Sequence, residues 1–170
     1  METIRVASCY ATMQPNLIRL LELVDAVFET RNDPSQIGFS DEDMAKMGEL
    51  HEACLQEASN TDGPIAWVSV IPTSNELMTL FVNEKITERE LFDLTTVQTP
   101  QEAVYLCSAI VLPEFRHSGV AFNLSVSAIR AMQMDNNITH VFVWPFTNEG
   151  ESLASKIAHA CGIPLELRPR

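Results

Sequence analysis

The chain is poor in positive charge. Its 170 residues hold 11 Lys and Arg against 23 Asp and Glu, for a formal net charge of −12. Proteins that bind nucleic acid or anionic membranes contact phosphates through clustered Lys and Arg, so this balance argues against both kinds of partner. A cationic partner is electrostatically easier to bind, although an acidic surface can serve solubility alone.

The sequence also lacks membrane, secretion and metal signatures. No apolar run approaches the roughly 20 residues that a membrane-spanning helix needs. Residues 1–9 carry Glu2 and Arg5 and have no apolar stretch of the kind found in a secretory signal. The four cysteines form no C-x-x-C pair, and His51 and His140 have no paired ligand spacing. We therefore expect reduced thiols, no bound metal and a cytoplasmic location.

What the chain does have is enough apolar material for a core. Hydrophobic residues make up 46% of it, and its length fits one domain that needs no disulfide or metal to fold. Strand-like and helix-like patterns intermix without a linker, a repeat or a low-complexity tract. We predict a single domain over residues 1–170, of the α/β (mixed α+β) class.

The hydrophobic periodicity, capping residues and turn residues place the individual elements. The expected strands cover residues 3–11, 64–72, 103–112, 140–146 and 163–167. The expected helices cover residues 15–31, 40–55, 74–82, 87–94, 119–134 and 151–160. Gly162 is predicted to end the last helix.

The junction between strand 103–112 and helix 119–134 carries the clearest chemical signal. A short loop at this place directs several unpaired backbone N–H groups and the helix dipole at one point. Gly119 permits close approach of a ligand, and Arg116 supplies a permanent cation with a forked set of donors. These features suit a pyrophosphate. The loop residues are Arg116, His117, Ser118, Gly119, Val120 and Ala121.

With the strand ending Val111-Leu112-Pro113 and then R-x-x-G-x-A, the sequence resembles the GNAT superfamily of acyl-CoA-dependent N-acyltransferases. The acyl-CoA signature of that family is [Q/R]-x-x-G-x-[G/A] after a strand ending V-x-P. A later strand, Asn148 and a helix closing at Gly162-Ile163 fit the family as well. The resemblance implies a central mixed, mostly antiparallel sheet, flanked by helices and splayed at the acyl-CoA site. It also implies a possible homodimer.

The function implied by the resemblance is transfer of an acetyl group from acetyl-CoA to a primary amine by direct attack. The amine belongs to a small molecule or a peptide that the sequence does not identify. Backbone N–H groups of residues 116–121 would bind the pyrophosphate, and Val111 would bind the thioester and pantetheine. Asn148 would take part in binding coenzyme A. Such a site works by positioning the reactants and stabilising the oxyanion.

The sequence departs from the family where proton transfer is concerned. The position of the acid found in many members, a Tyr four residues before the closing glycine, is Ala158. Strand 103–112 holds no carboxylate, so Tyr105 is the candidate that assists deprotonation through water. By the two-residue strand period, Tyr105 and Cys107 share one face and Ser108 takes the other. Cys107 is expected to be a buried core thiol rather than a reactive one.

These departures motivate an alternative, a non-catalytic acyl-CoA-binding or regulatory module on the same fold. A purely structural interaction domain ranks last, because it leaves the strand–loop–helix junction without a reason. A further departure lies at residues 75–97, where the family has a third strand paired with the second and this sequence predicts helices. Such a helical insertion would lie beside the acceptor cleft.

Overall fold

The computed structural model describes residues 14–30, 33–38 and 40–170. The strand expected at residues 3–11 lies outside the described residues. The helices are α1 (Pro15–Thr30), α2 (Asp41–Leu50), α3 (Asn75–Val82), α4 (Glu88–Leu94), α5 (Val120–Asp135) and α6 (Asn148–Cys161). The strands are β1 (Leu55–Asn60), β2 (Gly63–Thr73), β3 (Ala103–Val111), β4 (His140–Val143) and β5 (Leu165–Leu167). Short 3₁₀ turns, η2 (Glu52–Cys54) and η3 (Pro113–Phe115), precede β1 and follow β3.

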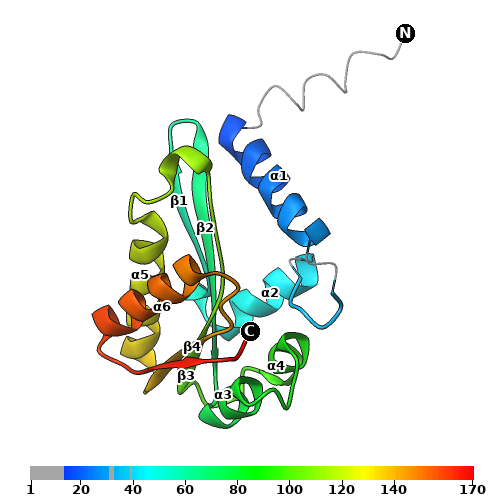
Figure 1. The fold of residues 1–170 in the computed structure, drawn as a ribbon, viewed down its shortest axis with the longest axis vertical. Coiled ribbons are helices and arrows are strands. Elements are labelled where there is room, and N and C mark those ends of the chain that lie inside the picture. The colour runs from blue at the N-terminus through cyan, green and yellow to red at the C-terminus, as the bar shows by residue number, and fades with distance from the viewer. Residues whose placement is uncertain (1–13, 31–32, 39) are drawn as a thin grey trace.

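The described strands form one mixed sheet in the order β1-β2-β3-β4-β5. β2 is antiparallel to β1 and β3, whereas β4 is parallel to β3 and β5. Helices α5 and α6 make the two parallel crossovers, and because such crossovers are right-handed, both helices lie on one face. Figure 1 shows α5 and α6 on one side of the sheet and α1 to α4 on the other. The class is therefore mixed α/β, with antiparallel and parallel pairings equally represented among the described strands.

The first hairpin corrects a prediction. The helix expected over residues 40–55 ends at Leu50, where His51 takes an extended conformation with φ −168°. Leu55 then begins β1, which pairs with β2 around a turn closed by Gly63 at φ +111°. The spacing of Leu55 fits a helical stripe, but an apolar residue at a strand start fits that spacing equally well. The chain thus forms a hairpin with β2 at residues where the sequence predicted the end of a helix.

Most other elements follow the local signals. β2 is buried along nearly its whole length, as expected for an apolar strand covered on both faces. Ser40 caps α2 through its side chain, and Thr87 and Glu90 form the expected capping box of α4. The last crossover differs by a few residues, since β4 ends at Val143 and α6 begins at Asn148, with Thr147 as its cap.

Phe81 ties the helices inserted between β2 and β3 to the sheet. Its side chain is fully buried, and its ring lies edge-on to Tyr105 of β3 and Phe142 of β4, with centroids 5.1 and 5.9 Å away. Arg168, which follows β5, donates to the carbonyl oxygens of Phe81 and Ile86 at 2.7 and 2.8 Å. The expected helical insertion is present, and it is part of the core.

Gly162 ends α6 in the left-handed region at φ +70°, with its N–H bonded to the carbonyls of Ala158 and His159. A Cβ at this position would meet no atom within 4 Å, so a side chain would cost only backbone strain. We expect Gly162→Ala to lower the free energy of unfolding by about 1–2 kcal/mol, measured by urea denaturation. Gly48→Ala in α2 is the matched control, and it should raise stability by up to about 1 kcal/mol because Gly48 is helical and exposed. A loss in both variants would contradict the assignment of strain to Gly162.

Candidate functional site

The sheet opens between β3 and β4. Their parallel pairing joins only Ala103–Tyr105 to His140–Phe142, yet β3 continues to Val111. Since parallel strands point the same way, the gap widens toward the carboxyl ends of both strands. In open α/β sheets a ligand binds beyond those ends, so this gap is the natural place for a site.

A β-bulge lies in β3 beside the gap. Ser69 of β2 pairs with Ser108 and Val70 pairs with Leu106, which leaves Cys107 as the extra residue. Tyr105 and Ser108 therefore lie on one face, and the Ser108 hydroxyl lies 2.7 Å from that of Ser69. The prediction that Ser108 takes the face opposite Tyr105 was wrong, because a bulge interrupts the two-residue period.

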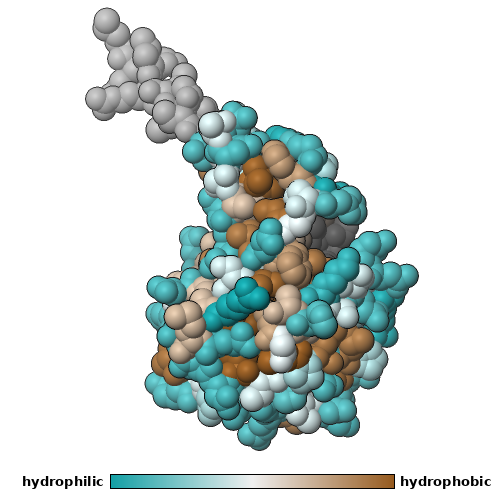
Figure 2. Space-filling model, turned by 90° about the vertical axis from the view of Figure 1, so that its left-hand side faces the viewer, coloured by the Kyte–Doolittle hydropathy of each residue, from teal (hydrophilic) through white to brown (hydrophobic). Residues whose placement is uncertain are grey.

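An outer cleft of about 1360 Å³ runs along this gap, between the end of β3, the loop into α5 and the flank of α6. Most residues expected to bind the coenzyme line it: Val111, Arg116, His117, Gly119, Val120, Ala121 and Asn148. Ser118 is the exception, because its hydroxyl donates to the carbonyl of Phe115 at 2.5 Å. Figure 2 looks onto the α5 and α6 side, where hydrophobic residues show along the middle of the face among hydrophilic ones.

The loop of the outer cleft has the backbone geometry of an anion site. His117 and Gly119 both take positive φ angles, +62° and +83°, and a left-handed residue in such a loop turns successive N–H groups toward one side. Within the described residues, no backbone N–H from residue 117 to residue 122 donates to a protein acceptor. A Cβ at Gly119 would find only Asn123 within 4 Å, at 3.9 Å, so the space beside it is open.

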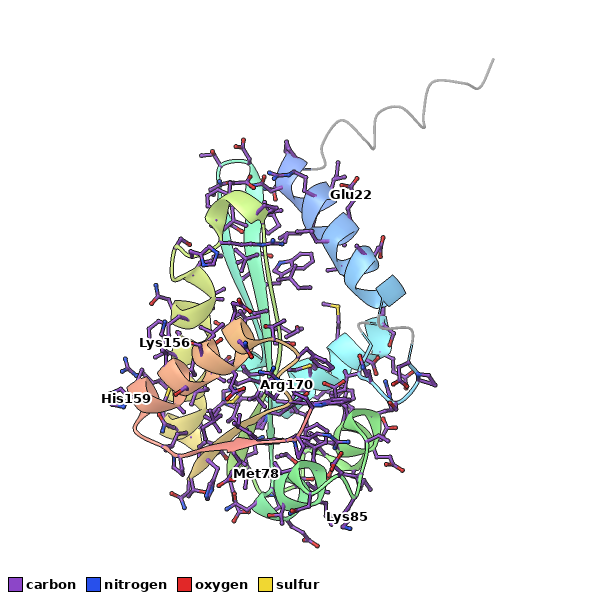
Figure 3. All side chains as sticks on the ribbon, in the orientation of Figure 1. Glu22, Met78, Lys85, Lys156, His159 and Arg170 are labelled. Carbon is purple, nitrogen blue, oxygen red and sulfur yellow. The ribbon has the colours of Figure 1, made fainter. Side chains whose placement is uncertain are left out.

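The outer cleft carries positive charge in an otherwise acidic protein. Two of its described lining residues, Arg116 and Lys156, are cationic, whereas only one, Glu149, carries a carboxylate. Lys156 and His159 project from α6 (Figure 3) and face the cleft, so α6 adds a cation to the anion site. Sequence reasoning missed Lys156, because only the packing of α6 beside α5 turns that helix face toward the loop. Asn148 begins α6, and its Oδ1 accepts from Arg170 at 2.9 Å.

A smaller inner cavity of about 300 Å³ continues from the outer cleft through the gap in the sheet. The two share Ala109, Ile110 and Leu153 in their walls. The inner cavity reaches the far face of the sheet, where Gln36, Ile37 and Glu88 line it. A group held at the end of β3 would therefore meet a molecule that enters from the side of α4.

Tyr105 lies in the core, with its side chain 1% exposed, and it is not among the described residues that line either space. Its hydroxyl donates to Glu88 Oε1 at 2.6 Å, and Glu88 lines the inner cavity. The predicted assistance by Tyr105 would therefore act through this carboxylate. Sequence reasoning missed Glu88, which looks like an ordinary first-turn residue of a capped helix. Nothing in its local pattern marks it as buried.

An ion pair joins α1 to η3, the turn that precedes the loop of residues 116–121 (the anion loop). Arg19 donates to both carboxylate oxygens of Glu114, at 2.6 and 2.8 Å. This hydrogen bond from Arg19, followed by one from the backbone of Glu114 itself, lowers the pKa of Glu114 to about 2. Glu114 is exposed to solvent, since its side chain is 45% accessible.

The titration of Glu114 tests this contact. A lowered pKa keeps the carboxylate ionised as the pH falls below its ordinary value of 4.5, and the pair is lost only as the pH falls through about 2. Carbon-detected NMR of the Glu114 carboxyl should show its midpoint near 2 in the unmodified protein and at a clearly higher pH in Arg19→Gln, still below the ordinary pKa of 4.5 because the backbone hydrogen bond remains. An unchanged midpoint in Arg19→Gln would show that Arg19 is not the cause.

The residues that the structure describes lack two further features. No group of three or more His, Cys, Asp or Glu among them is placed to hold a metal ion. None of the described helices has the length and apolar character needed to cross a membrane.

Comparison with known proteins adds no relative. Neither a protein-family model, nor a curated protein, nor a solved structure matches this chain. The geometry of the two connected spaces is therefore the basis for inferring a function.

Proposed function

We propose that the protein is an N-acetyltransferase that moves an acetyl group from acetyl-CoA to a primary amine by direct attack. The observation that supports this most is the outer cleft, where free N–H groups at the start of α5 meet open space beside Gly119. A pyrophosphate is the anion that such a cradle suits, because N–H groups and the helix dipole both favour negative charge there. Arg116 and Lys156 add two cations to the lining of the outer cleft.

The gap in the sheet accounts for the rest of the coenzyme. A pantetheine arm that leaves the loop would lie along Ala109–Val111, where β3 no longer pairs with β4. Strand N–H and C=O groups that have no partner on this edge can bond its amides, whereas the Val111 carbonyl accepts from Arg116 Nε at 3.3 Å. The thioester would then lie at the entrance of the inner cavity, where a backbone N–H can stabilise the oxyanion.

Binding and turnover test the proposal separately. Isothermal titration of the purified protein with acetyl-CoA should show saturable binding in the micromolar range. No binding at millimolar acetyl-CoA, by protein that melts cooperatively, would overturn the proposal. Thiol release from acetyl-CoA across a panel of alkylamines, polyamines, amino acids, aminoglycosides and peptides then measures activity. Tight binding with no turnover on any acceptor would favour the non-catalytic acyl-CoA-binding module.

A further inference from the structure

Glu88 places a carboxylate in the wall of an otherwise uncharged cavity. It is 6% exposed, and it is the only Asp, Glu, Lys, Arg or His among the described residues that line the inner cavity. It comes from α4, one of the two helices inserted between β2 and β3. Among the described residues, the insertion therefore contributes the one acidic group that lines the inner cavity.

Two donors among the described residues hold the Glu88 carboxylate. The Tyr105 hydroxyl donates to Oε1 at 2.6 Å, and the backbone N–H of Ile37 donates to Oε2 at 3.0 Å. An O–H···O distance this short is typical of a charge-assisted bond to an ionised carboxylate. Tyr105 is itself immobilised, since its ring stacks on Phe142 at 5.1 Å and meets the edge of Phe81. Glu88 is thus held in one orientation by a strand and a loop.

The remaining walls of the inner cavity are largely apolar. They include Ile37, Trp144 and Phe146, and the hydroxyls of Ser69 and Ser108 bond each other. A carboxylate in a cavity of low polarity attracts a cation strongly, because little water screens the charge. The volume of about 300 Å³ limits that cation to a small molecule or a single side chain.

We propose that Glu88 binds the ammonium group of the acceptor and takes its proton, and that the acceptor is a small primary amine with an apolar substituent. This inference rests on the proposed function, because it names the residue that binds the second substrate of the same reaction. Trp144, Phe146 and Ile37 would contact the substituent. Tyr105 is a positioning residue that acts through Glu88.

Glu88, the amine and the thioester account for every bond and proton in the reaction. The ammonium gives one proton to the Glu88 carboxylate, and the free amine attacks the thioester carbonyl carbon. The C–N bond forms, the C–S bond breaks, and the sulfur leaves as a thiol with a second proton from the nitrogen. Glu88 then returns its proton to solvent, so the products are the acetamide, coenzyme A and one proton.

Equilibrium binding of benzylamine tests the inference without requiring turnover. The protein is saturated with desulfo-coenzyme A, which cannot react, and benzylamine is titrated into the unmodified protein and into Glu88→Gln. Glu88→Gln should weaken benzylamine binding by about 10-fold or more, the loss expected for a buried ion pair. The affinity for desulfo-coenzyme A should not change. Benzyl alcohol, a neutral molecule of the same shape, should bind both proteins alike.

Glu102→Gln is the matched control. Glu102 also accepts a hydrogen bond from a backbone N–H, that of Asn75 at 3.1 Å, but it is not among the described residues that line either space. Glu102→Gln should therefore bind benzylamine like the unmodified protein. Equal benzylamine affinity in Glu88→Gln and the unmodified protein would overturn the inference. So would a protein that binds desulfo-coenzyme A but not benzylamine. Failure to bind any coenzyme overturns the proposed function, and this inference with it.

Tyr105→Phe provides a second variant that retains the buried ring. It removes only the hydroxyl that holds Glu88, so benzylamine binding should weaken by a smaller factor, about 3- to 10-fold, with unchanged affinity for desulfo-coenzyme A. A purely structural role would weaken both ligands together or neither of them, and either result would overturn the positioning role.

Discussion

Replacement of Gly119 by tryptophan is expected to abolish acetyl-CoA binding. Gly119 holds φ +83°, where a residue with a Cβ costs about 1–2 kcal/mol, and the space beside it is open in the outer cleft. An indole there would occupy the cradle and turn the N–H groups of the loop away from it. We expect the Kd for acetyl-CoA to rise about 100-fold or more, measured by isothermal titration.

Gly48→Trp is the control for Gly119→Trp. Gly48 lies on the exposed side of α2, where a Cβ meets no atom within 4 Å, and it is not among the described residues of the outer cleft. Gly48→Trp should bind acetyl-CoA with unchanged affinity. If Gly119→Trp still binds with the affinity of the unmodified protein while melting cooperatively, the coenzyme does not bind at this loop.

Replacement of Phe81 by alanine is expected to be the most destabilising change of those considered. Its side chain is fully buried and contacts the rings of Tyr105, Phe142 and Trp144. The guanidinium of Arg168 also lies 4.3 Å above its ring. Loss of the ring leaves a cavity between α3 and the sheet, so the free energy of unfolding should fall by about 3–5 kcal/mol in urea denaturation.

Leu94→Ala is the matched control on the inserted helices. Leu94 ends α4 and is 53% exposed, so its truncation should change stability by less than about 0.5 kcal/mol. A small effect of Phe81→Ala would show that the insertion is a peripheral flap. In that case the sheet would not hold α4, and Glu88 would lose its fixed place at the inner cavity.

The parts of the molecule that sequence analysis predicted are those encoded by neighbouring residues. Helix ends depend on a few adjacent positions. Examples are the capping box of α4 at Thr87 and Glu90, the start of α1 at Pro15 and the end of α6 at Gly162. The anion loop was predictable for the same reason. Its strand, its glycine and the helix that follows occur in one continuous segment, and most of its predicted residues line the outer cleft.

The errors occurred where spacing alone cannot choose between two structures. Leu55 fits a helical stripe and a strand start equally well, and pairing with β2 decides in favour of the strand. The bulge at Cys107 changes which side chains share a face of β3, and it is visible only in the register with β2. Both outcomes depend on hydrogen bonds to a partner strand, which the local pattern does not contain.

By itself, then, the sequence determined most of the order of helices and strands and the presence of the anion loop in an acidic chain. The tertiary structure decided that β3 and β4 part beyond Tyr105, that Lys156 lines the outer cleft, and that Tyr105 donates to Glu88 in the wall of the inner cavity. The physical reason is the range of the interactions. Caps, turns and loop N–H groups are set by residues a few positions apart, whereas a cavity and the carboxylate in its wall exist only after distant segments have packed together.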